Sequence, residues 1–458
     1  MLPSCLRKLV PAIAALLLSC QERNPVFCRA HPDDPGCADS TAIPPAACAS
    51  DTDCMKPTPV CDTTLAMCVE CTASAAAGCV GTTPVCGDQG RCRGCAADDE
   101  CASLVCLPDG ACAAALDVLY AAPTGSPVSS CQRAAPCSLG RAIAIADGTK
   151  VTIRLAAGNY DLDAPLALTA DAHLVGRGAV IDRDQRGSGP TLVVSDRAVV
   201  ALDYVSIEGG GGVGVGVGIG CTQATVIGRQ LGVRGNAAAG IAATDCTLAL
   251  ERAVIAGNQG VGVAATGGSL TLTRSVVVGN PGGGVAITGA AFVLENDAIV
   301  QNGGPFSLFG GVLITQIAAG GPHVLDFDTI AYNLAEPTLT AGVVCSVVGT
   351  PLTFSDSIVY ANGAGAQVEG GSCTWTYTDV APVAAPGVGI STRPASERRS
   401  REATYCAPRQ RRATRDSLWC LLRVITRRQK PSASRRKVQV AVCAAYAMGT
   451  SEGTTAEL

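Results

Sequence analysis

Aromatic residues and histidines are scarce in this chain. Phe, Trp and Tyr together make up 3% of the 458 residues, and there are three His. This low aromatic content, combined with 53 Gly, favours a solenoid of short strands over a β-sandwich or a β-barrel. The 48% hydrophobic content is ample for the core of such a solenoid.

Long apolar runs are lacking after residue 20. A transmembrane helix needs roughly 18–20 consecutive apolar residues, and no later segment reaches that length. Residues 1–20 have the basic start, apolar stretch and cleavage site of an export signal. Their end resembles a bacterial lipobox, which implies lipidation of Cys20 and attachment to a lipid bilayer through acyl chains. Gln21 then implies the outer membrane, on its periplasmic or cell-surface face; the alternative is an ordinary secretory signal.

Positive charge is scarce before the last part of the chain. Residues 393–458 carry 15 of the 34 Lys and Arg but only five acidic residues. The rest of the chain therefore has a net charge of about −14. A body with this charge is not expected to bind nucleic acid. Residues 390–458 form a basic tail, which we interpret as the product of a reading-frame shift near residue 390 or as a disordered extension.

A short phrase repeats at a fixed interval in the middle of the chain. Four asparagines mark it, each 22 residues from the next: Asn236, Asn258, Asn280 and Asn302. Apolar residues keep the same interval, as Ile255, Val277 and Ile299 do. A period of 20–30 residues is typical of solenoids, in which each unit buries its apolar face against its neighbours.

The segments inside one period are short, rich in Val, Ile, Leu and Thr, and separated by Gly, so they read as strands. The phrase of leucine-rich repeats is absent. We therefore predict an all-β parallel β-helix of about nine or ten coils, in which equivalent residues stack roughly 4.8 Å apart.

Twelve cysteines lie in residues 48–112, in three groups of four. Few large apolar residues lie between them, so cross-links must stabilise this segment. Disulfides are the preferred interpretation for an exported chain; zinc is the rival, because Cys68 and Cys71 have ligand spacing. The pattern is similar to the tandem four-cysteine modules of bacterial surface lipoproteins. We expect a stiff stalk here, preceded by a proline-rich tether over residues 21–47.

Residues 117–389 form the predicted β-helix domain. Cys131 and Cys137 flank a short polar loop and are expected to pair, and Ser138 is a candidate N-cap of a short helix. The helix beginning Cys-Ser-Leu and the strand ending Gly158-Asn159-Tyr160 resemble the start of pectin-lyase-like right-handed parallel β-helix proteins. This resemblance extends over roughly residues 118–380 and implies a capping helix on the first coil.

Two further cysteine pairs are one coil apart, Cys221 with Cys246 and Cys345 with Cys373. Stacked coils are close enough for disulfides, so we expect two disulfides between neighbouring coils; the alternative is free buried thiols.

After Asn302 the interval between asparagines lengthens, and the extra residues 303–311 include two Phe. Such insertions form loops on one face of a solenoid, which either contact a partner or pack on the protein itself.

Aligning Ile299, Ile330 and Ile358 places Asp297, Asp328 and Asp356 in one column, and aligns Tyr332 with Tyr360. Stacked carboxylates repel one another unless a cation, a proton or a hydroxyl intervenes. One interpretation is a ladder that binds Ca²⁺ or contacts a uronate. The favoured interpretation is structural, a column that accepts small polar residues at a bend.

No catalytic residue is assigned. The catalytic phrases of polygalacturonase-like and alginate-epimerase-like relatives are absent, and His173 and His323 lack an obvious acid partner in the sequence. Asp182/Asp184 and Asp326/Asp328 are weak candidates for a glycosidase pair. We therefore expect a non-catalytic lipoprotein that displays a β-helix. The β-helix would bind a glycan or another component of the cell envelope, or would have a structural role. No cofactor is expected. The alternative is a polysaccharide lyase or glycoside hydrolase of the pectin-lyase-like superfamily.

Overall fold

The computed structural model describes residues 48–388, apart from 75–77, 147, 149–150, 348–351, 364–365, 371 and 382–386. The chain divides into two compact units, Met1–Leu116 and Asp117–Leu458. The predicted signal with Cys20, the tether and the basic tail lie outside the described residues. None of the described helices has the length and apolar character that crossing a bilayer requires.

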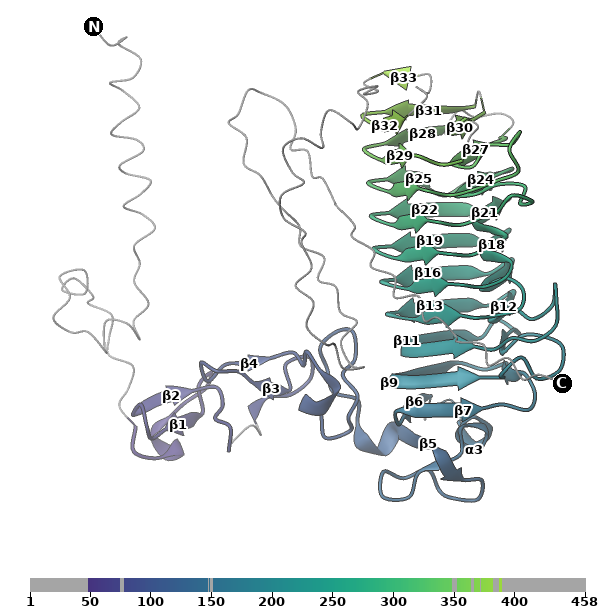
Figure 1. Ribbon diagram of the computed structural model, residues 1–458. Helices are drawn as coiled ribbons and strands as arrows, with labels where there is room; N and C mark the ends of the chain where they lie inside the picture. Colours follow the sequence, from purple (N-terminus) through teal and green to yellow (C-terminus); the bar gives the residue numbers. More distant parts are fainter. Residues whose placement is uncertain are drawn as a thin grey trace, which may run out of the picture. The chain divides into compact units, whose positions relative to one another are not determined.

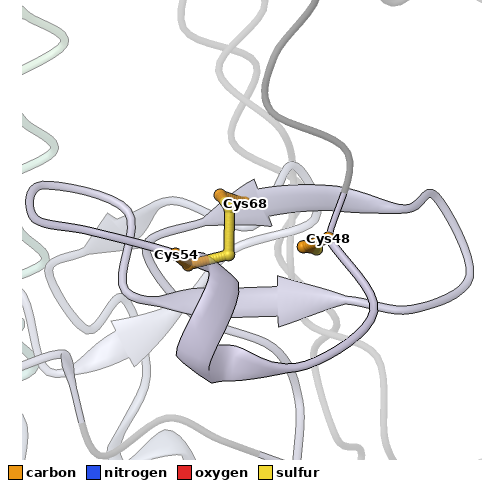
Figure 2. A group of neighbouring side chains, drawn as sticks. All are labelled: Cys48, Cys54 and Cys68. Atoms are coloured by element: carbon orange, nitrogen blue, oxygen red, sulfur yellow. A yellow bond between two sulfur atoms is a disulfide. The ribbon is translucent and has the colours of Figure 1, made fainter.

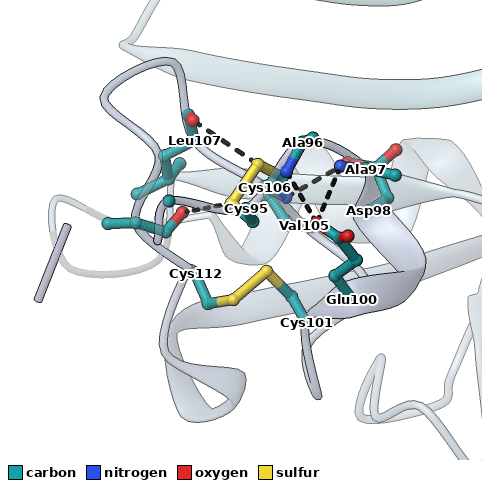
Figure 3. Close-up of a disulfide and its surroundings, with 12 residues drawn as sticks. Cys95, Ala96, Ala97, Asp98, Glu100, Cys101, Val105, Cys106, Leu107 and Cys112 are labelled. Carbon is teal, nitrogen blue, oxygen red and sulfur yellow. Dashed lines mark hydrogen bonds between the residues drawn. A yellow bond between two sulfur atoms is a disulfide. The ribbon is translucent and has the colours of Figure 1, made fainter. Parts of the chain in front are cut away.

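The cysteine-rich segment consists of three modules with one disulfide pattern. In each module the first cysteine bonds the third and the second bonds the fourth. Figure 2 shows the bond between the second and fourth cysteines of the first module, and Figure 3 shows both bonds of the third. The six bonds are Cys48–Cys61, Cys54–Cys68, Cys71–Cys86, Cys79–Cys92, Cys95–Cys106 and Cys101–Cys112. Three sulfurs of each module lie within 4.8 Å of one another. All twelve are oxidised, so the segment offers no thiolate for the rival zinc sites.

Acidic side chains order the loops of the first and third modules in the same way. The carboxylate of Asp53 accepts hydrogen bonds from the backbone N–H groups of Ala49 and Ser50, and Glu100 does the same for Ala96 and Ala97 (Figure 3). Short elements complete the unit: η1 (Asp51–Asp53), β1 (Val60–Asp62), β2 (Met67–Val69), β3 (Val85–Cys86), β4 (Cys92–Arg93), η3 (Asp98–Glu100) and η4 (Ala115–Asp117).

The second unit is a parallel β-helix of about ten turns, as predicted (Figure 1). Each regular coil contributes one strand to each of three sheets, and equivalent strands of successive coils are parallel and in register. We number the sheets in the order in which the chain enters them. The first bend joins the first and second sheets, and the second bend joins the second and third.

The first sheet comprises β5 (Val118–Ser126), β6 (Thr152–Leu155), the first part of β9 (Ala172–Asp182) and of β11 (Val199–Glu208), β13 (Thr225–Arg229), β16 (Thr247–Glu251), β19 (Ser269–Thr273), β22 (Ala291–Glu295), β25 (His323–Asp326), β28 (Leu352–Ser355), β31 (Cys373–Thr376) and β33 (Gly387–Val388). The second comprises β7 (Gly158–Asp161), the second part of β9 and β11, β14 (Gly232–Arg234), β17 (Val254–Ala256), β20 (Val276–Val278), β23 (Ala298–Val300), β26 (Thr329–Ala331), β29 (Ile358–Tyr360) and β32 (Asp379–Ala381). The third comprises β8 (Leu166–Leu168), β10 (Leu192–Val194), β12 (Ile219–Thr222), β15 (Ile241–Thr244), β18 (Val261–Thr266), β21 (Gly283–Thr288), β24 (Val312–Ile314), β27 (Val343–Cys345) and β30 (Val368–Glu369).

The predicted asparagine row is present at the second bend. Asn236, Asn258 and Asn280 are fully buried, and the Nδ2 of each donates to the Oδ1 of the next asparagine, at 2.7, 2.9 and 2.8 Å. The row continues through Asn302, Asn333 and Asn362, and Gln367 ends it by accepting from Asn362. Each Oδ1 also accepts the backbone N–H of the preceding asparagine, as Asn258 does from Asn236. The row therefore satisfies backbone donors that the bend would otherwise leave buried and unpaired.

Columns of aliphatic side chains fill the interior. Ile255, Val277 and Ile299 face one another on successive strands and are completely buried. Towards the last coils, aromatic side chains replace aliphatic ones in the interior. The ring of Phe354 packs between those of Phe292 and Trp375, at centroid distances of 6.2 and 5.2 Å. Burial of such columns is the main favourable contribution to a solenoid's stability.

A short helix lies at the start of the β-helix. The helix α3 (Leu139–Ile145) buries Leu139 and Ala142, and the Oγ of Ser138 accepts the backbone N–H of Arg141 as an N-cap. Cys131 bonds Cys137 immediately before it. Two further disulfides join neighbouring coils, Cys221–Cys246 and Cys345–Cys373.

The insertion after Asn302 divides into a packed and an exposed part. Phe309 is buried, and its ring fills the space over Gly283, where a Cβ atom would lie 2.4 Å from it. Phe306 is 94% exposed and Leu308 is 77% exposed. The loop thus packs on the protein through one of its two Phe.

Candidate functional site

The aspartate column of the first bend differs from the predicted one. Ile330 of β26 faces Val359 of β29 rather than Ile358. The column accordingly runs through Ser275, Asp297, Asp328, Ser357 and Thr378. Asp356 lies outside it, so the prediction for Asp356 was wrong. The correct step was readable from the asparagines, since Asn333 and Asn362 are 29 residues apart, whereas the alignment of isoleucines assumed 28.

The same one-residue difference in register means that Tyr332 and Tyr360 do not face each other. Tyr360 faces Ala331, so Tyr332 is one position away from the predicted alignment. The rings nevertheless make an edge contact, with centroids 6.0 Å apart. Tyr332 has a left-handed backbone conformation, with φ of 57°, at the start of the second bend.

A calcium ladder does not fit the aspartates. The Oδ1 of Asp297 accepts the backbone N–H of Ser275 at 2.7 Å, and its Oδ2 accepts that of Glu295 at 3.2 Å. The Oδ1 of Asp328 accepts the N–H of Asp297 at 2.8 Å, which leaves only its Oδ2 without a partner. Calcium requires six to eight oxygen ligands, and one free buried oxygen cannot supply them.

Both aspartates are almost inaccessible to solvent, at 2% and 1% exposure. Burial raises the pKa of Asp297 to about 8, against the opposing effect of the backbone hydrogen bonds from Ser275 and Glu295. Burial and then the charge of Asp297 raise the pKa of Asp328 well above its ordinary value. These groups belong to the interior of the bend and are not available to a ligand.

A polar strip runs along the outer side of the first sheet at its last position. Register places its members on successive coils: Asp203, Arg229, Glu251, Thr273, Glu295, Asp326, Ser355 and Thr376. The Nη1 of Arg274 donates to Glu251 at 2.9 Å. Glu251, Thr273, Arg274, Glu295 and Asn296 surround a hollow of about 260 Å³.

Exposed aromatic side chains flank this polar strip on the first bend. Phe327 and Tyr377 are 37% and 59% exposed, and both have the left-handed conformation that also occurs at Arg274, Asn296 and Asp356. Such residues belong to one bend column and point out of the coil beside the strip. Asp356, which the sequence alignment placed in one column with Asp297 and Asp328, is instead one of these exposed bend residues.

A second hollow, of about 310 Å³, lies where the second sheet meets the second bend near the start of the solenoid. Asp182, Asp184, Gln185, Glu208, Gly209 and Gly235 line it. Asp182 and Glu208 face each other on β9 and β11, and Arg234 follows Glu208 on β14. Burial raises the pKa of Glu208; Arg234 opposes this shift and Asp182 adds to it.

The structure therefore pairs Asp182 with Glu208 rather than with Asp184. Asp184 instead donates its backbone N–H to the Oδ1 of Asp182 at 2.6 Å. The weak candidate pair Asp326/Asp328 is divided, because Asp326 faces outward in the polar strip while Asp328 is buried. The pairing with Glu208 depends on a 26-residue step from Asp182 to Glu208, which does not match the 22-residue repeat.

Sequence reasoning missed the partner of His173. Its Nε2 lies 2.7 Å from the Oδ2 of Asp203, and Arg229 binds both oxygens of the same carboxylate, at 2.9 and 2.8 Å. His323 is different. It occupies the position opposite Phe292, its ring contacts that side chain edge-on, and its buried Nε2 has no hydrogen-bond partner among the described residues.

Comparison with known proteins agrees with this architecture. The family described as "Right handed beta helix region" matches residues 215–380. This region is a right-handed β-helix. No curated protein matches the chain.

The right-handed β-helix is also similar to two solved structures. One is pectate lyase Pel9A, at 15% identity and a TM-score of 0.40, with 60% of this chain and 76% of that chain covered. The other is the GH136 lacto-N-biosidase from Eubacterium ramulus, at 8% identity and a TM-score of 0.27, with 60% and 65% covered.

Proposed function

We propose that the β-helix binds an extended glycan along the polar strip without cleaving it. The observation that carries this proposal is the strip itself, in which hydrogen-bonding side chains repeat at every coil beside the exposed rings of Phe327 and Tyr377. Stacked strands place these groups roughly 4.8 Å apart. A long ligand can therefore meet a hydrogen-bonding side chain at each step along the solenoid.

The chemistry of the strip suits a polyhydroxylated ligand. Carboxylates, hydroxyls and the Arg274 guanidinium offer both donors and acceptors around the 260 Å³ hollow. Aromatic rings supply apolar contact area at low cost in conformational entropy. Because the strip is open and its groups are spread over several coils, affinity would come from the length of the ligand rather than from one deep pocket.

The proposal is tested by replacing the two rings. We expect the double substitution Phe327→Ala/Tyr377→Ala to reduce glycan binding at least tenfold, as measured by affinity electrophoresis on a panel of neutral and acidic polysaccharides. Tyr332→Ala, which removes an exposed ring from the second bend, is the matched control and should bind as the parent does. Equal binding by the double variant would refute a role for the strip.

A specific observation favours one alternative, glycoside hydrolysis at the 310 Å³ hollow. Glu208 is half-buried with a raised pKa and faces Asp182 across one strand spacing, which suits a general acid beside a second carboxyl group. If this alternative holds, the chain should release reducing ends from a polysaccharide, and Glu208→Gln should abolish the release. Glu251→Gln, in the other hollow, is the control and should retain it.

We also propose that the chain is exported and held at the outer membrane by acyl chains on Cys20. The support is the lipobox-like sequence ending at Cys20 and the nine described disulfides, which suit an oxidising compartment. Labelled palmitate should be incorporated into the parent chain but not into Cys20→Ser. Labelling of that variant would exclude Cys20 as the anchor.

A further inference from the structure

Positive and negative groups are paired in the first part of the polar strip. Arg229 binds both oxygens of Asp203, at 2.9 and 2.8 Å, and Arg274 donates to Glu251 at 2.9 Å. After Arg274 the sequence has no Lys or Arg before Arg393. The later coils of the strip therefore have no lysine or arginine of their own to neutralise an acidic side chain.

Three carboxyl groups lie on these later coils. Glu295 faces Asp326 on the next coil, and Asp356 is exposed on the first bend one coil further. Among the described residues, no ion pair neutralises any of the three. Burial raises the pKa of Asp326, and the charges of Asp356 and Glu295 add to that rise, while a hydrogen bond from Ser355 opposes it. A cation placed among these groups would remove their mutual repulsion.

Exposed aromatic rings alternate with the carboxyl groups on the first bend. Phe327, Asp356 and Tyr377 occupy equivalent positions on three successive coils, with φ between 51° and 58°. Phe327 is also the residue directly after Asp326. The face of an aromatic ring attracts a protonated amine through the quadrupole of the ring. The rings thus indicate the same class of ligand as the carboxyl groups, through a different physical interaction.

We propose that the strip prefers a glycan of amino sugars with free, protonated amines, which Glu295, Asp326 and Asp356 select over neutral and acidic polysaccharides. This inference rests on the proposed function, because it names the class of glycan that the strip binds. An ammonium group on the ligand gains from a carboxylate and from a neighbouring ring at the same time. A polymer of uronates would bring like charges together on coils that have no arginine, which disfavours its binding.

A matched pair of ligands tests the charge preference. Oligomers of glucosamine and of N-acetylglucosamine, of equal length and linkage, differ in the charge of the amine. We expect the parent chain to bind the glucosamine oligomer about tenfold more tightly, because several exposed charge pairs each contribute modestly. The measurement is isothermal titration calorimetry at low ionic strength and at a pH below the pKa of the amines. Added salt should reduce the preference, since it screens exposed charges.

A charge-neutral variant identifies the residues responsible. Glu295→Gln/Asp326→Asn/Asp356→Asn keeps hydrogen-bonding groups of similar size and removes the three charges. We expect it to bind the two oligomers equally, with the circular dichroism spectrum of the parent chain. Glu369→Gln, which removes an exposed carboxylate from the third sheet, is the control and should keep the preference.

The outcomes separate this inference from the proposed function. Equal binding of the two oligomers by the parent chain, or a preference retained by the triple variant, would overturn the inference and leave glycan binding along the strip intact. Binding of neither oligomer would overturn it as well, and the proposed function fails with it only when the wider polysaccharide panel is also negative. Should the triple variant not fold, the comparison of the two oligomers on the parent chain still decides.

Discussion

Single residues at the bends decide whether a buried backbone donor is satisfied. At the second bend every coil from Asn236 to Asn362 uses the same amide, which donates and accepts at once. At the first bend the coils use hydroxyls and two carboxyls instead. The amide row is independent of pH, whereas the first bend acquires a dependence on pH wherever a carboxyl replaces a hydroxyl.

Asn280→Ala should be strongly destabilising. The substitution leaves the backbone N–H and the Nδ2 of Asn258 without their shared acceptor in a fully buried site. Each unsatisfied donor costs about 1–3 kcal/mol, so we expect a loss of about 2–5 kcal/mol in the free energy of unfolding, measured by denaturant titration. Asn296→Gly, at an exposed bend position whose left-handed backbone glycine adopts without strain, should change it by less than about 0.5 kcal/mol. Equal losses from the two variants would contradict the role of the row.

His323 should make the last coils sensitive to acid. Burial lowers the pKa of His323, so the unfolded chain binds a proton at a pH where the folded chain does not. Stability contributed by the neutral ring is then present above the unfolded pKa, near 6.5, and is lost as the pH falls below it. Thermal denaturation from pH 7 to pH 5 should show a smaller decline for His323→Leu than for the parent chain. A steeper decline in the thermal stability of His323→Leu than in that of the parent chain would contradict this prediction, because it would show that the protonated ring stabilises the fold.

Elements of this solenoid are predictable to different degrees. Strands and columns between residues 235 and 303 follow directly from a 22-residue repeat, and the residues that interrupt it become bends. Where the interval lengthens, the isoleucines no longer fix the register, because Ile330 of β26 faces Val359 of β29 rather than Ile358. The asparagines still fix it, since Asn333 bonds Asn362. Contacts such as His173 with Asp203 depend on side chains 30 residues apart, for which the sequence has no repeating signal.

The disulfides between coils should act as local staples. Cys221–Cys246 closes a loop with a sequence separation of 25, and a loop of this size restricts the unfolded chain by an amount equivalent to about 3 kcal/mol. We expect Cys221→Ala/Cys246→Ala to lower the free energy of unfolding by about 2–4 kcal/mol with the strand order intact, as judged by denaturant titration and circular dichroism. No loss of stability would show that the bond adds nothing to the stacked coils.

The whole molecule combines two units that are stabilised by different means. Within the residues that the structure describes, the cysteine-rich unit has six disulfides and few buried apolar side chains, whereas the β-helix has continuous apolar columns and three disulfides. A thiol reductant should therefore unfold the first unit and leave most of the second folded. Hydrogen exchange of the full chain measures this directly. Residues 48–112 should lose protection on reduction, while β16, β19 and β22 keep it. Loss of protection in these strands at the same reductant concentration would contradict the division.

The bend column beside the polar strip also gives the molecule evenly spaced attachment points. Arg252, Arg274, Asn296, Phe327, Asp356 and Tyr377 share one backbone conformation, with φ between 51° and 59°, although their side chains differ widely. Chemical labels installed at any two of them would sit at separations in multiples of roughly 4.8 Å. The distance between two probes attached to this column is therefore set by the number of coils that separate them.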